Sequence, residues 1–271
     1  MSNVKIHPTA IVEKGAQIGT GCEIGPGAIV ESEVELGEGC LVGPRAVLQG
    51  RVKMGPKNRI GVGAVIGGEP QDLAYQGAKS GVVLGEGNTL REYVTIHRGT
   101  KEGTDTVIGN GCFLMVGAHV AHNCRLADGV ILVNNVLLAG YVEVEEKAFL
   151  GGAVVVHQFV RIGKLAMVRG QTRVGMDLPP YCMAVATNGV CGLNLVGLKR
   201  AGVAPDGRKA LQRVYEEFFF GGKNRVQALE EIRKGKDAKN KEVKEFCDFI
   251  EKTKRGICHG LKAGEISLEE N

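Results

Sequence analysis

The sequence KIHPTA IVEKGA QIGTGC EIGPGA IVESEV ELGEGC LVGPRA, residues 5–46, repeats one pattern of six residues seven times. The second position of each hexad is aliphatic, the sixth is mostly small, and glycine recurs at the third and fifth. The aliphatic positions continue without exception to Ile66. A period of six fits neither an α-helix nor a simply alternating strand, so each hexad is expected to form a short strand followed by a tight turn.

Three hexads close one triangular coil of about 18 residues, in which the aliphatic side chains stack on their equivalents about 4.8 Å away along the axis. The pattern predicts a left-handed parallel β-helix, the exception to the right-handed crossover rule. The rhythm breaks near residues 67–82 and 101–106, where we expect outward loops, and ends near Asp177. Three flat faces on one prism favour packing in threes, so a homotrimer is expected.

A small helical domain is expected after the prism. The motif LPPY at residues 178–181 contains two prolines, which cannot join a strand ladder. Helical apolar spacing then appears in three segments, at residues 205–219, 222–234 and 241–253. We therefore expect a β-helix over residues 1–190, with the outward loops near 67–82 and 101–106, and an α-helical domain over residues 191–271.

The composition narrows the class of protein. The chain has no run of about 18 apolar residues and no apolar signal core near its start, so we expect a cytoplasmic protein without stable membrane insertion. Forty-one glycines, no tryptophan and 5% aromatic residues predict a narrow, repetitive core. The eight cysteines form no CxxC pair, and four of them, expected to be small apolar fillers, stand in the sixth position of a hexad: Cys22, Cys40, Cys112 and Cys124.

The net charge of +4 comes entirely from the C-terminal part of the chain. Residues 1–198 hold 17 Lys+Arg and 17 Asp+Glu, whereas residues 199–271 hold 17 and 13, a difference of 4. This excess fits either a solvated helical surface or a site for an acidic protein partner. No nucleic-acid binding is expected.

Two of the six histidines, His119 and His122, lie close together in the stretch 117–140, GAHVAHNCRLADGVILVNNVLLAG. A third, His157, follows His119 by two coils plus two residues. A histidine titrates near neutral pH, which suits it as a general base. A metal site is the alternative, but the HxxxxH spacing of the gamma-class carbonic anhydrases is absent. A purely structural pair also remains possible at this point.

Several motifs are longer than the hexad repeat requires. They are KIHPTAIVEKGAQIG, PQDL, TIHRGT, AHVAHNC, LAGYV, VHQF, DLPPY, GLNLVGLKRAG and RGIC. With these motifs the chain resembles, nearly end to end, the acyl-carrier-protein:UDP-N-acetylglucosamine O-acyltransferase family, whose members begin lipid A biosynthesis. The resemblance implies transfer of an acyl group from the carrier thioester to the sugar 3-hydroxyl, with no cofactor and no metal.

By this resemblance His122 is the general base, and the backbone N–H of Gly140 faces the developing oxyanion. Gly140 could equally be an ordinary corner glycine of the repeat. Gly170 matches the acyl-chain ruler, where a glycine leaves room for a long 3-hydroxyacyl chain. The remaining matched positions contact the nucleotide sugar or the acyl-phosphopantetheine, and they are Gln71, Asp72, His119, His157, Gln158, Asn194 and Arg200. The basic helical surface, including Lys199, suits an acidic acyl carrier protein.

The chain departs from the family pattern at four positions. Asn123 replaces the aspartate of AHxAHDC, and Tyr141 replaces the histidine of LAGHV; both residues adjoin the expected base and belong to the expected substrate site. Val196 and Ala74 replace a glutamate and a lysine. The altered neighbours of His122 keep one alternative open, acylation of a 3-amino sugar nucleotide or another acceptor. Two alternatives from other classes also remain, a non-catalytic trimeric scaffold and a metal-dependent hydratase.

Overall fold

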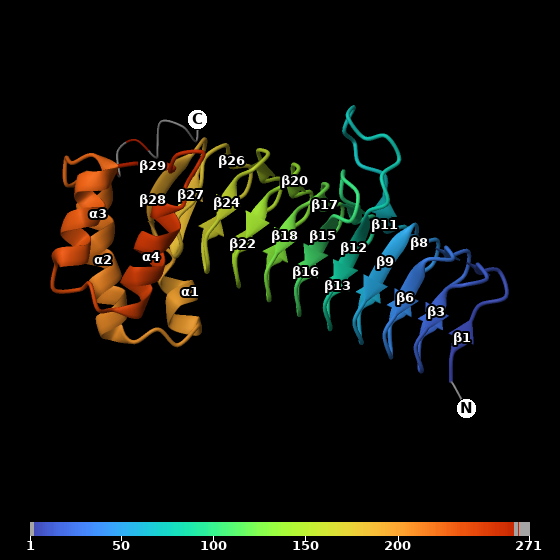
Figure 1. The fold of residues 1–271 in the computed structure, drawn as a ribbon. Coiled ribbons are helices and arrows are strands. Elements are labelled where there is room, and N and C mark those ends of the chain that lie inside the picture. The colour runs from blue at the N-terminus through green and yellow to red at the C-terminus, as the bar shows by residue number, and fades with distance from the viewer. Residues whose placement is uncertain (1–2, 263–264, 266–271) are drawn as a thin grey trace.

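The computed structural model describes residues 3–262 and residue 265. The first two-thirds of the chain forms the left-handed parallel β-helix that the hexads predict, and the helices gather at its C-terminal end (Figure 1). Three sheets, here called A, B and C, make the faces of the prism, and their strands pair in parallel except for one antiparallel pair at the C-terminal end of sheet A.

The chain visits the three sheets in turn. Sheet A contains β1 (Lys5–Ile6), β4 (Glu23–Ile24), β7 (Leu41–Val42), β10 (Arg59–Ile60), β13 (Thr89–Leu90), β16 (Phe113–Leu114), β19 (Ile131–Leu132), β22 (Phe149–Leu150), β25 (Met167–Val168), β27 (Cys182–Val185), β28 (Gly189–Leu193) and β29 (His259–Gly260). Sheet B contains β2 (Ile11–Val12), β5 (Ile29–Val30), β8 (Val47–Leu48), β11 (Val65–Gly68), β14 (Thr95–His97), β17 (His119–Val120), β20 (Leu137–Leu138), β23 (Val155–Val156) and β26 (Arg173–Val174). Sheet C contains β3 (Gln17–Ile18), β6 (Val34–Leu36), β9 (Arg51–Met54), β12 (Gly81–Leu84), β15 (Asp105–Ile108), β18 (Arg125–Leu126), β21 (Glu143–Val144) and β24 (Arg161–Ile162).

Equivalent residues of successive coils pair in register. Ile24 pairs with Val42, which is 18 residues later, and both side chains are 3% exposed. The aliphatic second positions therefore fill the prism as predicted. The four cysteines in sixth positions are buried, and each thiol donates to a backbone carbonyl of the next coil, as Cys124 does to Ala139 at 3.1 Å. These cysteines are small core fillers, as expected.

Both breaks in the rhythm are loops at one corner of the prism. The first joins β11 of sheet B to β12 of sheet C and rises clear of the coils in Figure 1. The second joins β14 of sheet B to β15 of sheet C. The pairing continues on either side of each loop, since β11 pairs with β14 and β12 with β15. The inserted residues are therefore held outside the core at the corner between sheets B and C.

The C-terminal helices are α1 (Leu195–Arg200), α2 (Pro205–Phe220), α3 (Arg225–Lys234) and α4 (Lys241–Glu251). The sequence did not predict α1. It also placed the start of α3 too early, because Gly222 adopts a left-handed φ of 73° and the side chain of Asn224 caps the helix by accepting from Gln227 N. Strand β28 extends the sheet to Leu193, beyond residue 190, and β29 adds a last strand from the chain end.

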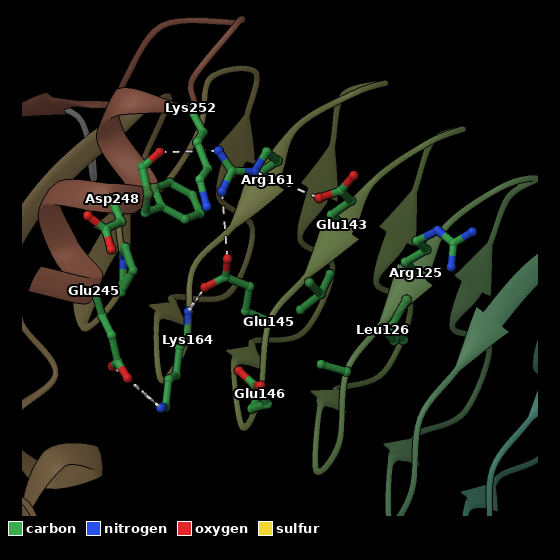
Figure 2. Close-up of a pocket in the computed structure, with 14 residues that line it drawn as sticks. Arg125, Leu126, Glu143, Glu145, Glu146, Arg161, Lys164, Glu245, Asp248 and Lys252 are labelled. Carbon is green, nitrogen blue, oxygen red and sulfur yellow. Dashed lines mark hydrogen bonds and ion pairs between the residues drawn. The ribbon is translucent and has the colours of Figure 1, made fainter. Parts of the chain in front are cut away.

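Arg161 joins the prism to the helical domain (Figure 2). Its guanidinium lies 4.0 Å from the ring centroid of Phe249 in α4 and donates to the Phe249 carbonyl at 3.2 Å. Beside it, Lys164 pairs with Glu245 at 3.3 Å. Burial raises the pKa of Glu145, whose carboxylate lies 3.6 Å from Arg161. These contacts hold α4 against sheet C.

Within the described residues, no helix has both the length and the apolar character needed to cross a bilayer.

Candidate active site

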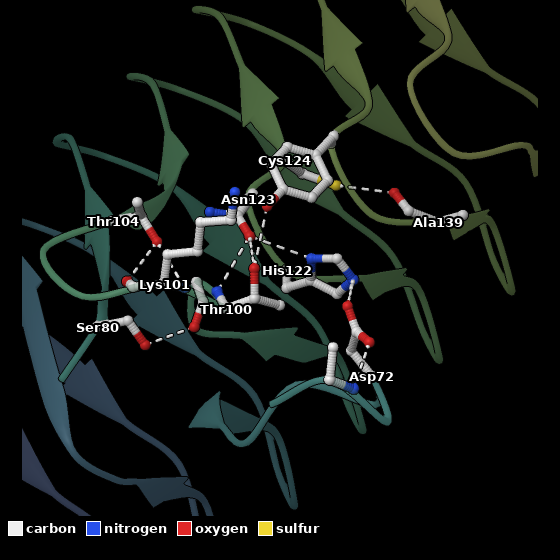
Figure 3. A network of polar contacts seen from close by, with 12 residues as sticks. Asp72, Ser80, Thr100, Lys101, Thr104, His122, Asn123, Cys124 and Ala139 are labelled. Carbon is white, nitrogen blue, oxygen red and sulfur yellow. Dashed lines mark hydrogen bonds and ion pairs between the residues drawn. The ribbon is translucent and has the colours of Figure 1, made fainter. Parts of the chain in front are cut away.

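His122 lies at the corner between sheets B and C, in the turn that joins β17 to β18. The two outward loops leave the prism at this same corner, so residues distant in sequence reach the imidazole (Figure 3). His122 is only 6% exposed. The corner therefore combines a buried imidazole with polar groups from three separate segments.

Each nitrogen of His122 faces a different polar group. Nδ1 lies 3.1 Å from Oδ1 of Asn123, and Nε2 lies 3.8 Å from a carboxylate oxygen of Asp72 in the first loop. Figure 3 shows the ring between these two side chains. The sequence placed Asp72 in the substrate site, and the structure adds that its carboxylate approaches His122.

Asn123 belongs to a hydrogen-bond network that includes the second loop. Its Oδ1 accepts from the backbone N–H and from the hydroxyl of Thr100, both at 3.0 Å. The hydroxyl of Thr100 is also 3.0 Å from the hydroxyl of Tyr141. Tyr141 packs edge-on against His122, with ring centroids 5.3 Å apart. The two residues beside His122 that depart from the expected family pattern, Asn123 and Tyr141, are thus connected through Thr100.

Gly140 stands one coil above His122 and approaches it closely. A Cβ built on Gly140 would lie 2.3 Å from Cε1 of His122, closer than any real contact permits. The position therefore requires glycine for a local steric reason. Other glycines of the repeat are equally restricted, as at Gly37 and Gly61, but there the added Cβ would meet the backbone of the next coil and not a histidine ring.

A third histidine, His97, joins His119 and His122 at this corner. His119 is held by Thr95, with its Nδ1 2.7 Å from the threonine hydroxyl, and its ring meets that of His97 edge-on at 4.9 Å. Burial and then the charges of His119 and His122 lower the pKa of His97 from 6.5 to about 4. Burial and then His122 also lower the pKa of His119. Both rings are thus kept neutral at physiological pH.

The sequence analysis did not single out His97, Thr95 or Thr100 as site residues. All three lie in the motif TIHRGT, and β14 is paired with β17, so that Thr95 lies beside His119. Counting one coil back from His119, with allowance for the loop between them, would have found them. Gln71 lies next to Asp72 in the first loop, where the sequence placed it.

His157 and Gln158 lie at the same corner, further toward the helical domain. Gln158 follows Gly140 by 18 residues, the length of one coil, so it occupies the equivalent turn position. His157 is exposed, with its Nδ1 3.3 Å from the Gln158 carbonyl. The corner therefore continues from His122 as a row of polar groups.

The structure places Asn194 and Arg200 on a different face. Asn194 caps α1 by accepting from Gly197 N at 2.9 Å, and it donates to the Leu165 carbonyl at 2.9 Å. With Arg200 it lines a mostly apolar groove of about 760 Å³ on sheet A, beside Phe149 and Met167. Gly170 is exposed at the corner between sheets A and B. A single chain does not bring these three residues to His122.

In the described part of the chain, no group of three or more His, Cys, Asp or Glu side chains is arranged to hold a metal ion.

Comparison with known proteins gives one consistent family. The family described as "Udp N-acetylglucosamine O-acyltransferase; Domain 2" matches residues 177–258, and the bacterial transferase hexapeptide family matches residues 1–32 and 105–140. A protein of Trichlorobacter lovleyi named acyl-[acyl-carrier-protein]--UDP-N-acetylglucosamine O-acyltransferase is 50% identical over 264 residues, which cover 95% of this chain and 100% of that protein. A protein of Anaeromyxobacter sp. (strain K) with the same name is 41% identical over 93% of this chain and 98% of its own length.

Solved structures agree with these relatives. The UDP-N-acetylglucosamine acyltransferase of Francisella novicida superimposes with a TM-score of 0.90 at 36% identity, over 95% of each chain. The corresponding acyltransferase of Campylobacter jejuni gives a TM-score of 0.88 at 34% identity, over 94% of this chain and 99% of that one.

Proposed function

This chain belongs to the acyl-[acyl-carrier-protein]–UDP-N-acetylglucosamine O-acyltransferase family, and on that premise we propose that His122 is the general base of the reaction. The protein is an acyltransferase that moves an acyl group from acyl carrier protein to UDP-N-acetylglucosamine, the first step of lipid A biosynthesis. The acceptor atom is proposed to be the sugar 3-hydroxyl.

The observation that carries this proposal is the buried imidazole whose two nitrogens face different partners. Nε2 of His122 takes the proton from the 3-hydroxyl as that oxygen attacks the thioester carbonyl. The tetrahedral oxyanion is stabilised by the N–H of Gly140, whose lack of a side chain permits the close approach to His122. Collapse of the intermediate expels the phosphopantetheine thiolate, which receives the proton from the imidazolium. Neither a cofactor nor a metal is needed for these steps.

A homotrimer is supported by the chemistry of the outward side chains. Sheet C presents charged residues, among them Glu35, Lys53, Arg125, Glu143 and Arg161. The middle strands of sheets A and B instead present apolar residues, among them Phe113, Ile131, Phe149 and Met167 on A, and Ile29, Val47, Leu137 and Val155 on B. The outward charged residues of these two sheets lie toward their ends, at Lys5, Glu23 and Arg59 on A and at Arg173 on B. Contact of face A of one chain with face B of the next closes a ring of three and leaves the charged face C in water.

The same packing completes the site. His122 lies at the edge of face B, whereas Asn194 and Arg200 lie on face A. Contact between the two faces brings His122 of one chain toward Asn194 and Arg200 of its neighbour. Arg200 then clamps a phosphate of the substrate with its planar guanidinium. Because the donor is an acyl carrier protein, we place the reaction in the cytoplasm.

The proposed donor carries a long 3-hydroxyacyl chain. Gly170 is exposed and has no side chain to obstruct an extended chain on face B. On that face Leu137 is 45% exposed and Val155 is 37% exposed, which provides apolar surface close to His119. The remaining substrate contacts are assigned to Gln71, Asp72, His119, Asn123, Tyr141, His157 and Gln158.

A 3-amino sugar nucleotide is the second candidate acceptor, favoured by the neutral Asn123 at the Nδ1 of His122. An amine needs less assistance from a base than a hydroxyl does. The test is incubation with acyl-carrier donors of several lengths and either UDP-N-acetylglucosamine or its 3-amino analogue, followed by mass spectrometry of the products. We expect the O-acyl product, and we expect its loss in His122→Ala. Transfer unaffected by His122→Ala would refute the base, and no product from any pair would favour a scaffold.

A further inference from the structure

An asparagine beside a catalytic histidine can either help or hinder it. In serine proteases, an amide in place of the carboxylate that orients the histidine imposes the wrong tautomer and lowers kcat about 10⁴-fold. The outcome depends on which end of the amide faces the ring, because the oxygen accepts a hydrogen bond and the NH₂ group donates one. The orientation of Asn123 therefore decides which nitrogen of His122 carries the proton.

Thr100 determines that orientation. Its backbone N–H can only donate, and it lies 3.0 Å from the same Asn123 atom that faces His122. That atom must therefore be the amide oxygen. The hydroxyl of Thr100 gives the same oxygen a second donor, also at 3.0 Å. An oxygen facing Nδ1 of His122 at 3.1 Å requires Nδ1 to carry the proton, which leaves the lone pair of the neutral ring on Nε2.

We propose that Thr100 is a positioning residue that, through Asn123, holds neutral His122 in the Nδ1–H tautomer with Nε2 free to accept a proton. The proposal deepens the assignment of His122 as general base and rests on it for its catalytic meaning. The second outward loop thereby has a role, because it brings Thr100 to a corner that uninterrupted hexads would leave without this donor.

Tyr141 completes the arrangement. Since the Thr100 hydroxyl donates its proton to Asn123, the Tyr141 hydroxyl at 3.0 Å must donate to Thr100. The backbone of Asn123 is held as well, because its N–H donates to Thr106 at 2.8 Å and its φ is 59°. The residues at positions 123 and 141 therefore act together, because the hydroxyl of Tyr141 donates to the Thr100 hydroxyl that in turn donates to Asn123.

Orientation and charge come from separate residues in this site. A single carboxylate at position 123 would both orient His122 and stabilise the imidazolium, whereas Asn123 can only orient it. The Asp72 carboxylate, 3.8 Å from Nε2, is the nearby negative charge on the opposite side of the ring. We therefore assign the two roles to Asn123 and Asp72 respectively.

The direct test is the tautomer of His122 in the full-length protein, read from the ¹⁵N chemical shifts of labelled histidine side chains at a pH where the ring is neutral. The His122 signals are assigned by comparison with His122→Gln. We expect the Nδ1–H form in the wild type and in Asn123→Asp, and loss of this preference in Asn123→Gly. Glycine tolerates the left-handed φ at position 123, so Asn135→Gly, at φ 58° in another turn, is the matched control. An Nε2–H form in the wild type would overturn the proposal, as would an unchanged Asn123→Gly spectrum.

Steady-state kinetics provide a second test of the positioning role of Thr100. Thr100→Val removes the hydroxyl donor but keeps the backbone N–H, so we expect kcat to fall about tenfold with KM for the sugar nucleotide unchanged. Tyr141→Phe is expected to have a smaller effect of the same kind. Thr104→Val removes a hydroxyl of the same loop that bonds Lys101, and it serves as control. A raised KM with unchanged kcat in Thr100→Val would contradict the positioning role.

The spectrum needs no turnover, so the two proposals can fail separately. If the wild type shows the expected tautomer but His122→Ala keeps full activity, the general-base role of His122 is wrong and the positioning role of Thr100 stands. If His122→Ala loses activity but the wild type shows the Nε2–H tautomer, the positioning role of Thr100 is wrong and the general-base role of His122 stands.

Discussion

Gly140 faces the imidazole of His122 so closely that a Cβ at position 140 would lie 2.3 Å from Cε1 and 2.5 Å from Nε2. The two residues occupy equivalent turns of successive coils, and the turn above can pass over the ring only if it has no side chain. The backbone at Gly140 and Nε2 of His122 are thereby brought together at one point.

Gly140→Ala is expected to displace the imidazole and lower kcat by about 100-fold or more, because general base and oxyanion stabilisation are both disturbed. Steady-state kinetics measure the loss, and circular dichroism checks the fold. Gly175→Ala is the matched control, since its Cβ would come no closer than 3.5 Å to the Asn188 amide. If Gly140→Ala and Gly175→Ala lower kcat equally, the loss comes from adding a side chain anywhere in the coil and not from the contact with His122.

Asp72→Asn removes the carboxylate 3.8 Å from Nε2 of His122. The imidazolium formed during catalysis loses a neighbouring negative charge, so we expect kcat to fall by about tenfold, with the loss reduced by solvent screening at the partly exposed carboxylate. Glu69→Gln changes the charge of the same loop without facing His122, because Glu69 pairs with Arg98. If Glu69→Gln lowers kcat as much as Asp72→Asn does, the effect is one of loop charge alone.

His97 should make the stability of the protein depend on pH. Its pKa is lowered from 6.5 to about 4, chiefly by burial. Below pH 6.5 this histidine binds a proton in the unfolded chain but not in the folded chain. The contribution of His97 to the free energy of unfolding is therefore fully present above pH 6.5 and is lost as the pH falls toward 4. The shift corresponds to about 3 kcal/mol of unfolding free energy.

Urea unfolding between pH 4 and pH 7, at fixed protein concentration, measures this loss. His97→Gln should flatten the slope over this range, whereas His259→Gln, which replaces an exposed histidine near the chain end, should leave it in place. A slope that is the same in the wild type and in His97→Gln would show that other groups govern the acid sensitivity.

Gly170→Met is expected to shift the donor preference from long to short acyl chains, because the new side chain blocks the path of the distal carbons. A panel of acyl carrier donors measures kcat/KM against chain length. A Cβ on Gly170 would already lie 3.2 Å from the Gly152 carbonyl, so Gly170→Ala separates this backbone contact from the length of the methionine. A wild-type preference for short chains, or no shift in Gly170→Met, would remove Gly170 from the chain-length role.

Two inactive variants should restore each other if the site is shared between chains. In randomly mixed trimers of His122→Ala and Arg200→Ala, about a quarter of the sites combine an intact His122 with an intact Arg200 of the neighbouring chain. The variants are unfolded and refolded together, and transfer is then assayed against each variant refolded alone. Activity near a quarter of wild type is expected, and no activity in the mixture would place both residues of a site in the same chain.

The hexads made the fold predictable from the sequence. An aliphatic residue recurring every six positions specifies which side chain points inward, and no other regular structure satisfies that period. The helices of the C-terminal domain were predicted less well. A local cap decided where α3 begins, and α1 depends on the side chain of Asn194 and on its contact with Leu165.

The sequence by itself determined the coil, the burial of its aliphatic residues and the presence of His122 at a corner, because each follows from a short-range period. Only the tertiary structure decided what surrounds His122. Asp72 reaches His122, and Thr100 reaches the adjacent Asn123, because two insertions of different length leave the prism at the same corner, and the geometry of such loops is not encoded in the repeat. Asn194 and Arg200 lie on another face of the prism. The sequence could not place them relative to His122, because contacts between flat faces depend on whole surfaces and not on local spacing.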